Sequence, residues 1–468
     1  MAGGINFSGL ASGIDTAALI QATSDATRAA RVAPSEKRLT ELEETNAAAE
    51  ELTTKLDLLK ASLKNFTTVN GGGVSKTATS SKESVLAASV TNSAINGAYS
   101  VSVTSLAKNH TYSFDQTFAS SSTALDAALT GSEPALDRTV TFTVGTGGQQ
   151  ETVSVEVTDG SFTISDFVTA FNNASTKAQA SLVNTGSSAS PAYKIVVSSN
   201  YEGTEKGTIT RTALGASLGV LTAAGEDAAT DASVTVTGIG TVTRATNSIS
   251  DIIPGVTLSL SSTGTATVRI SEDPDTTVSK VQDFIDTYND VVKYINEGNV
   301  VTRDETKKEV TNTFGPLAAT RVDDNALTAL RSAISASKSA GGTAIRIFAD
   351  LGITTQRDGT LLFDSAKLKS AIASEPTSVS DVLSSFADTA AKTGGTIDIY
   401  TRFNGLIDLT INTNKDAIAD LNDRIQETER QIERQEESMR ARYARLESLM
   451  SKLQQQQSSL TSALRGLG

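Results

Sequence analysis

The chain has 468 residues, a net charge of −13, no Cys or Trp and a single His. This length exceeds one ordinary hydrophobic core, so we expect several domains. Without thiols and with one imidazole, few side chains remain for metal binding or covalent catalysis, and the negative charge argues against nucleic acid as a partner. We therefore expect no enzymatic activity, no cofactor and no metal site.

The sequence contains no apolar run near the roughly 18 residues that a membrane-spanning helix needs. Its beginning lacks the basic start, unbroken apolar segment and cleavage site of a secretory signal. We therefore expect a cytoplasmic protein without a membrane span, unless the chain leaves the cell by a route that needs no cleaved signal.

The first helix is predicted to follow the motif GLASGIDTAALI at 9–20. Asp15 fits its N-cap, and Ile14 and Leu19 would be among its first apolar contacts. We expect residues 9–20 to be disordered in the monomer and to become ordered on assembly.

A second helix is predicted from apolar residues that recur every seven positions, a spacing typical of helices that pack side by side. Two such sets interleave: Leu42, Ala49, Leu56 and Leu63, and Leu52, Leu59 and Phe66. The Gly-rich stretch at 70–75 should end this helix.

From about 76 to 274 the hydrophobic pattern has a period of two, which indicates β-strands. The segments 139–144 and 152–157 read as a hairpin joined by a Gly-containing turn. A short helix is predicted at 163–175, with Ser165 as its N-cap. We expect two small β-rich domains, one inserted in the other.

Helix returns at 276–296, where apolar residues step by three or four. Further along, Asp358 and Gly359 predict the turn of a short hairpin, and Asp364 or Ser365 can cap the helix that follows.

An unbroken seven-residue repeat at the C-terminal end indicates a coiled coil. It consists of Ile418, Ile425, Ile432, Met439, Leu446, Leu453, Leu460 and Leu467. Such a helix needs partners, so we expect the two chain ends to pair in one helical stalk. The residues expected to mediate helix pairing or oligomerisation are Ile14, Leu19, Leu42, Leu52, Leu56, Leu59, Leu63, Ile418, Leu421, Ile425, Ile432, Met439, Leu446, Leu449, Leu453 and Leu460.

The only imidazole, His110, is interpreted as a surface histidine, because no nucleophile or orienting carboxylate accompanies it. The Ser- and Thr-rich strands also permit an exported adhesin that binds host surfaces, although aromatic residues that could stack on sugars are few and scattered.

Several segments together resemble the flagellar filament cap protein family, also called hook-associated protein 2. GLASGIDT at 9–16 resembles the family's opening, and 97–114 resembles its first β segment. The most specific similarities lie at 247–260, 281–296 and 349–372. They occur in the family's order and cover nearly the whole chain.

The resemblance implies an α+β multidomain fold, with N- and C-terminal helices paired in a coiled-coil stalk and β-rich domains inserted between them. The implied domains are 1–45 with 415–468, a terminal coiled coil; 46–75 with 275–414, a helical bundle with a short hairpin; 76–136 with 230–274, a β-rich domain; and 137–229, an inserted β-rich domain similar to one in hook proteins.

The resemblance also implies a function, that of a cap at the distal tip of the bacterial flagellar filament. Such a protein is secreted by the flagellar type III export route, promotes folding and insertion of flagellin, and prevents its loss. Its implied partners are further copies in a ring, flagellin, hook–filament junction proteins and an export chaperone at the C-terminal helix. Five copies are expected, with four or six as alternatives.

Two other functions stay open on the sequence, the adhesin and a hook–filament junction protein. A junction protein should lack the segment at 349–372.

Overall fold

The computed structural model describes residues 15–219, 221, 223–304, 311–318, 320–341 and 344–465. Contacts divide the chain into a helical unit (Met1–Thr67, Val278–Ala371 and Ser378–Gly468) and a β-rich unit (Thr68–Thr277 and Ile372–Thr377). The predicted α+β multidomain class is confirmed. The finer four-part division stays a prediction.

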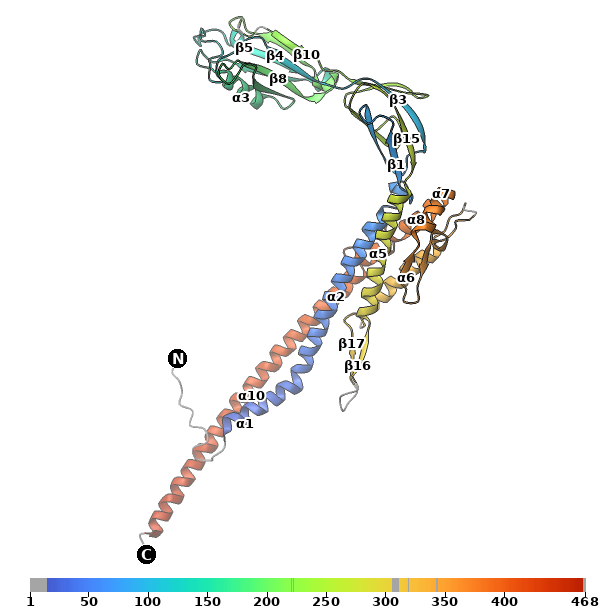
Figure 1. The fold of residues 1–468 in the computed structure, drawn as a ribbon. Helices are drawn as coiled ribbons and strands as arrows, with labels where there is room; N and C mark the ends of the chain where they lie inside the picture. The colour runs from blue at the N-terminus through green and yellow to red at the C-terminus, as the bar shows by residue number, and fades with distance from the viewer. Residues whose placement is uncertain are drawn as a thin grey trace. The chain divides into compact units, whose positions relative to one another are not determined.

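The helical unit is built on long helices, and α10 runs beside α1 and α2 (Figure 1). The helices outside the β-rich region are α1 (Thr16–Arg31), α2 (Ala33–Lys64), α5 (Pro274–Gly298), α6 (Val322–Ala336), α7 (Ser365–Ser374), α8 (Pro376–Ala390), α9 (Thr396–Thr401) and α10 (Leu406–Arg465). Two hairpins accompany them: β16 (Val301–Asp304) with β17 (Thr311–Phe314), and β18 (Ile353–Thr355) with β19 (Leu361–Phe363).

Local signals explain where α1 and α2 begin. Asp15 caps α1 as predicted, because its carboxylate accepts the N–H of Ala18 at 2.9 Å. Residues 16–20 are helical in the single chain, in contrast to the disorder expected for 9–20, and residues 9–14 lie outside the described residues. Pro34 lies in the first turn of α2, where a missing N–H costs nothing. The boundary at Val32 therefore separates two helices that would otherwise be continuous.

The β18–β19 hairpin is held on α5 by two asparagines. The Asn289 side chain accepts the N–H of Leu361 at 2.6 Å and donates to its carbonyl at 2.9 Å, as a neighbouring strand would. Asn296 donates to the carbonyl of Asp358 at 3.0 Å. The predicted turn is confirmed, with Gly359 at φ 88°.

The predicted cap of α7 is also confirmed. The Asp364 carboxylate accepts the N–H groups of Ala366 and Lys367 at 3.0 and 3.1 Å.

Aromatic rings fill the centre of the helical unit. Phe284 of α5 is 1 % exposed and lies between four other rings, with centroid distances of 5.5 to 6.5 Å. These rings belong to Phe66, Tyr288, Phe348 and Phe386. Segments far apart in sequence therefore meet at one side chain.

The first core of the β-rich unit lies between two antiparallel sheets. Their strand orders are β1–β15–β3–β11–β12 and β13–β14–β2. The strands are β1 (Lys76–Ser80), β2 (Leu86–Val90), β3 (Gly97–Ser105), β11 (Ala232–Val236), β12 (Gly240–Arg244), β13 (Ser248–Ile249), β14 (Val256–Leu260) and β15 (Gly264–Glu272). Inward Val, Leu and Ile alternate with outward Ser and Thr, which explains the period of two.

The second core belongs to the segment between β3 and β11. Its sheets have the orders β10–β4–β8–β7 and β6–β5–β9. The elements are β4 (Asn109–Phe114), β5 (Thr139–Val144), β6 (Glu151–Glu156), α3 (Ile164–Ala174), β7 (Ala178–Asn184), β8 (Tyr193–Glu202), α4 (Thr204–Gly207), β9 (Ile209–Leu214) and β10 (Ala223–Asp227). The predicted β5–β6 hairpin is confirmed, and Phe114, Phe142, Phe167 and Phe171 pack together in this core.

The predicted N-cap of α3, Ser165, is wrong, and Thr163 takes this role. The Thr163 hydroxyl accepts the N–H of Asp166 at 3.1 Å, and the Asp166 carboxylate accepts the N–H of Thr163 at 2.9 Å. This reciprocal pair satisfies two N–H groups at the helix start, which Ser165 inside the helix cannot do.

The prediction that His110 is a surface histidine is also wrong, since it is only 1 % exposed. Its Nδ1 accepts the N–H of Ile209 in β9 at 3.1 Å, and its Nε2 lies 3.1 Å from Oε1 of Glu226 in β10. His110 alternates in phase with Tyr112 and Phe114, so β4 directs all three inward. The imidazole therefore links strands of both sheets.

We expect acid to weaken this link. Burial lowers the pKa of His110 below 6.5, although Glu226 and Asp227 oppose the shift. The folded state thus favours neutral imidazole, whose contribution to stability is full above about pH 6.5 and is lost as pH falls toward the lower folded pKa. Protonated Nδ1 can no longer accept the N–H of Ile209.

Hydrogen exchange at the Ile209 amide, corrected for intrinsic rates, measures this effect. Protection should fall between pH 7 and 5 in the wild type. In His110→Asn, whose side-chain oxygen can replace Nδ1 without titrating, protection should change little. Equal pH dependence in the two proteins would contradict the assignment.

Candidate assembly interface on the helical unit

One antiparallel register joins α10 to α1 and α2. Asn414 of α10 donates to the side-chain oxygen of Asn46 in α2 at 2.9 Å. Arg28 of α1 forms ion pairs with Glu429 at 3.0 Å and Glu436 at 3.4 Å. Arg28 precedes Asn46 by about as many residues as the midpoint between Glu429 and Glu436 follows Asn414. Both contacts therefore belong to the same antiparallel register.

Arg28 holds α1 against α10 by bridging two turns of the longer helix. Its hydrogen bond to Glu429, followed by the nearby charges, raises the pKa of Arg28 above its ordinary value. The guanidinium is about one third exposed, so water screens the pair and its contribution is modest. The arginine mainly determines which residues of α10 lie beside α1.

The Asn46–Asn414 pair lies in the α2–α10 seam, and Asn46 is 8 % exposed. Because a buried amide must find a partner, a polar pair inside an apolar seam favours one register over shifted ones. Sequence reasoning missed this pair, because each asparagine alone is an ordinary polar helix residue.

We expect Asn414→Ala to destabilise the helical unit by about 1–3 kcal/mol, because the Asn46 amide then loses its partner. Thr413→Ala, at an exposed neighbouring position, should change the free energy of unfolding by less than about 0.5 kcal/mol. Thermal unfolding followed by helical circular dichroism compares them. Equal melting temperatures for the two variants would contradict a role for the amide pair.

The N-terminal residues predicted to pair are mostly buried: Leu42, Leu52, Leu56, Leu59 and Leu63. Leu19 is 44 % exposed, and Ile14 lies outside the described residues. On α10, Ile432 is buried, while Ile418, Leu421, Ile425 and Met439 are half-buried. The structure thus buries the predicted residues of α2 and covers the first part of the heptad repeat. That these two sets pair with one another stays a prediction.

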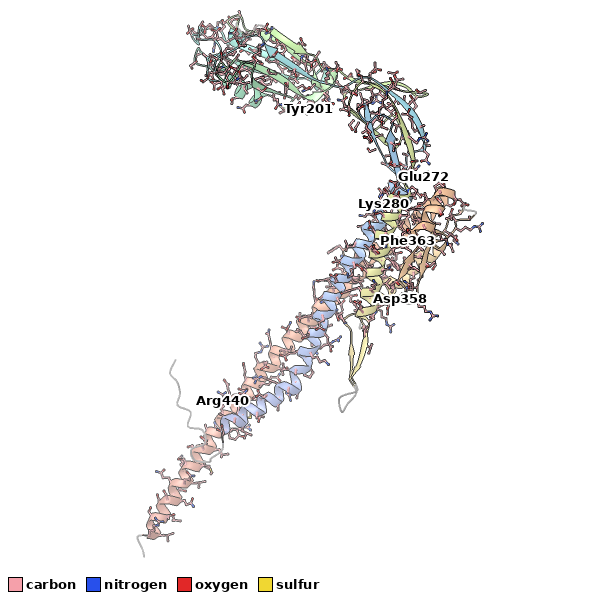
Figure 2. All side chains as sticks on the ribbon, viewed as in Figure 1. Tyr201, Glu272, Lys280, Asp358, Phe363 and Arg440 are labelled. Carbon is pink, nitrogen blue, oxygen red and sulfur yellow. The ribbon has the colours of Figure 1, made fainter. Side chains whose placement is uncertain are left out.

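The later heptad residues that the structure describes have no such cover, and Leu467 lies outside the described residues. Arg440 marks the region of α10 beside α1, and the helix continues past it (Figure 2). Leu446, Leu449, Leu453 and Leu460 are 52–66 % exposed. Leu464 is 65 % exposed as well, although it is not part of the predicted seven-residue repeat.

These five residues, named here the C-terminal leucine row, lie on one face of α10. At 3.6 residues per turn their positions fall within a narrow arc. A long helix that exposes a row of leucines on a polar background is typical of one that packs on another helix. The row is therefore the strongest candidate for an interface with a partner.

Among the residues that the structure describes, no helix has the length and apolar character required to cross a membrane. Within the same residues, no group of three or more His, Cys, Asp or Glu side chains is arranged to hold a metal ion.

Comparisons with known proteins agree on one family. A model of the flagellar hook-associated protein 2 N-terminus matches residues 12–110, and a model of the flagellar hook-associated protein 2 C-terminus matches residues 229–455. Together the matches cover well over half of the chain. The segment between them contains the second core of the β-rich unit.

Two relatives from Pseudomonas aeruginosa are similar to the chain. The B-type flagellar hook-associated protein 2 of strain PAO1 is 27 % identical over 454 residues, covering 88 % of this chain and 89 % of the relative. The A-type flagellar hook-associated protein 2 is 24 % identical over 235 residues, covering 48 % of each.

The fold is similar to that of a solved structure, the D1-D2-D3 domains of the flagellar cap protein FliD from Escherichia coli. The TM-score is 0.57 at 20 % sequence identity, over 78 % of this chain and 99 % of that one. At this identity the likeness concerns the fold alone.

Proposed function

Because the chain belongs to the flagellar hook-associated protein 2 family and is a flagellar filament cap protein, we propose that its copies assemble into a ring at the filament tip. The contact between copies is made by the C-terminal part of α10. The ring promotes folding and insertion of exported flagellin and prevents loss of flagellin to the medium. Five copies form the ring, with four and six as the alternatives.

The C-terminal leucine row is the observation that supports assembly. Burying one leucine fully contributes about 1.5–3 kcal/mol, and these residues are more than half exposed in the single chain. Packing them against the same helix of further copies would remove that apolar surface from water. Such helices pair by inserting side chains from one into spaces between side chains of the other.

The proposal also includes the route and the neighbours of the protein. It leaves the cell unfolded by flagellar type III export, which suits a sequence without Cys because no wrong disulfide can form outside. An export chaperone covers the C-terminal helix before export. Hook–filament junction proteins lie beneath the cap when the filament begins to grow.

A strain that lacks this chain tests the proposal. Complementation with the wild-type gene should restore long filaments and reduce monomeric flagellin in the medium. Normal filaments without the protein, and no spilled flagellin, would show that it is not required for capping. Electron microscopy of the purified oligomer, with its symmetry counted, decides between five, four and six copies.

A further inference from the structure

The chain crosses twice between the first and the second core of the β-rich unit. Residues 106–108 lead from β3 to β4, and residues 228–231 lead from β10 back to β11. The two crossings are paired with each other: Lys108 and Thr230 exchange backbone hydrogen bonds of 2.9 and 3.3 Å, and the Thr230 hydroxyl donates to the carbonyl of Leu106 at 2.9 Å. The connection is therefore a short two-stranded ribbon and not a pair of free linkers.

Asn247 of the first core holds this ribbon from the side. It lies between β12 and β13, where its side-chain oxygen accepts the N–H of Ala107 at 2.9 Å and its amide nitrogen donates to the Ala107 carbonyl at 2.8 Å. The Asn247 backbone N–H donates to the carboxylate of Glu202, the last residue of β8, at 3.2 Å. One residue of the first core thus contacts both the ribbon and the second core.

The turn that follows β8 is bonded to the same ribbon. The Asp231 carboxylate accepts the N–H of Thr204 at 2.7 Å and the Thr204 hydroxyl at 3.0 Å. The N–H of Gly203 donates to the carbonyl of Lys108 at 3.1 Å. These bonds attach a turn of the second core to both crossings, because Lys108 belongs to one crossing and Asp231 to the other.

Gly203 also lies directly against the first core. A Cβ atom on Gly203 would lie 2.5 Å from the Cβ of Ala245 and 2.6 Å from its Cα, much closer than carbon atoms without a bond between them approach. The φ of Gly203 is 78°, in the region that glycine adopts at no steric cost. Ala245 follows β12, so the backbones of the two cores meet at this position, and only glycine fits there.

We call residues 106–108, 202–204, 230–231, 245 and 247 the core joint. A hinge needs a few residues whose backbone angles can change freely. In the core joint, backbone groups of both crossings and of the turn after β8 are already hydrogen-bonded to one another or to Asn247. Rotation of one core against the other would break several of these bonds at once and would separate Gly203 from Ala245.

We propose that the core joint holds the two cores of the β-rich unit together as one rigid arm, and that Gly203 permits the close contact on which the joint depends. Neighbouring domains in one chain move relative to each other unless the contact between them prevents it. Here the contact is made of directional hydrogen bonds, so it fixes orientation as well as distance. The second core is thereby fixed to the first core and moves with it.

Distances between electron spins measure whether the cores move as one body. The chain has no Cys, so labels can be attached at chosen exposed positions, Thr265→Cys in β15 of the first core and Thr152→Cys in β6 of the second core. The labelled full-length chain is mixed with an excess of unlabelled chain, so that labels in different copies do not contribute. The unchanged joint should give one narrow distance distribution.

Variants of the joint should lose that narrow distribution. Gly203→Ala places a methyl group against Ala245, and Asn247→Ala removes both side-chain bonds to Ala107 without adding bulk. Gly238→Ala is the matched control, because Gly238 has a similar φ of 85° but nothing lies within 4 Å of the added methyl group. This control should keep the narrow distribution. Circular dichroism of each variant shows whether it is folded.

The measurement concerns the single chain and does not depend on the proposed function. A broad distribution in the unchanged chain would show that the cores move independently, which overturns the proposal. Narrow distributions in both Gly203→Ala and Asn247→Ala would overturn it as well, and equal broadening in Gly238→Ala would refute the role of the Gly203 contact. If this chain fails to restore capping while its distribution is narrow, the proposed function fails and the core joint stands.

Discussion

Replacing Leu446, Leu449, Leu453 and Leu460 together by Gln will abolish filament capping and leave the fold of the single chain nearly unchanged. These side chains are 52–66 % exposed, so the isolated chain loses little packing. Gln also forms helix about as well as Leu. An interface that buries four leucines would lose on the order of 6–12 kcal/mol for each copy, enough to prevent assembly.

The measurements are filament length, monomeric flagellin in the medium, and sedimentation of the purified protein. A matched control changes Ser451, Gln455, Ser459 and Ser462 to Ala. At 3.6 residues per turn these positions lie on the opposite face of the same helical segment. Normal capping by the leucine variant, or equal loss in the control, would show that the row is not the assembly surface.

Replacing Phe284 by Ala will produce the largest loss of stability, about 3–5 kcal/mol. The ring is 1 % exposed and contacts four other rings, which are anchored in separate segments of the helical unit. Removing it leaves a cavity that helices on several sides would have to move to fill. A loss of this size is a large share of the 5–15 kcal/mol that stabilises a typical domain.

Calorimetry can follow this loss, because the rings around Phe284 belong to the helical unit, whereas the β-rich unit has two cores of its own. The transition of the helical unit should shift to lower temperature, while that of the β-rich unit should stay in place. Phe403→Ala makes the same chemical change at a residue that is 86 % exposed, and it should cost less than about 0.5 kcal/mol. Similar shifts for both variants would contradict the placement of Phe284 at the centre of the core.

Two of the wrong predictions concern features that local sequence patterns already indicate. His110 alternates in phase with Tyr112 and Phe114, so the strand pattern itself indicates an inward histidine. Likewise, Thr163 stands three residues before Asp166, the spacing of a reciprocal helix cap, whereas Ser165 does not. In both cases the prediction followed the type of the residue, whereas its position in the pattern indicates the correct role.

Features that depend on spacing along the chain follow from the amino-acid order alone. Seven-residue repeats produce α2 and α10 as long helices that need partners, and a period of two produces the two-sided strands. Local side-chain hydrogen bonds explain the beginnings of α1 and α7 in the same way. The order of short motifs along the chain also indicated the family, which the comparisons confirm.

Which of those side chains remain exposed depends on how the helices pack in three dimensions. Ile432 and Leu446 occupy the same heptad position, yet one is 2 % and the other 53 % exposed, because α10 continues beyond the region that lies beside α1. Burial is a property of what lies opposite a residue, and spacing along one helix carries no information about that. For the same reason, the Asn46–Asn414 pair could be found only after segments distant in sequence had been brought together.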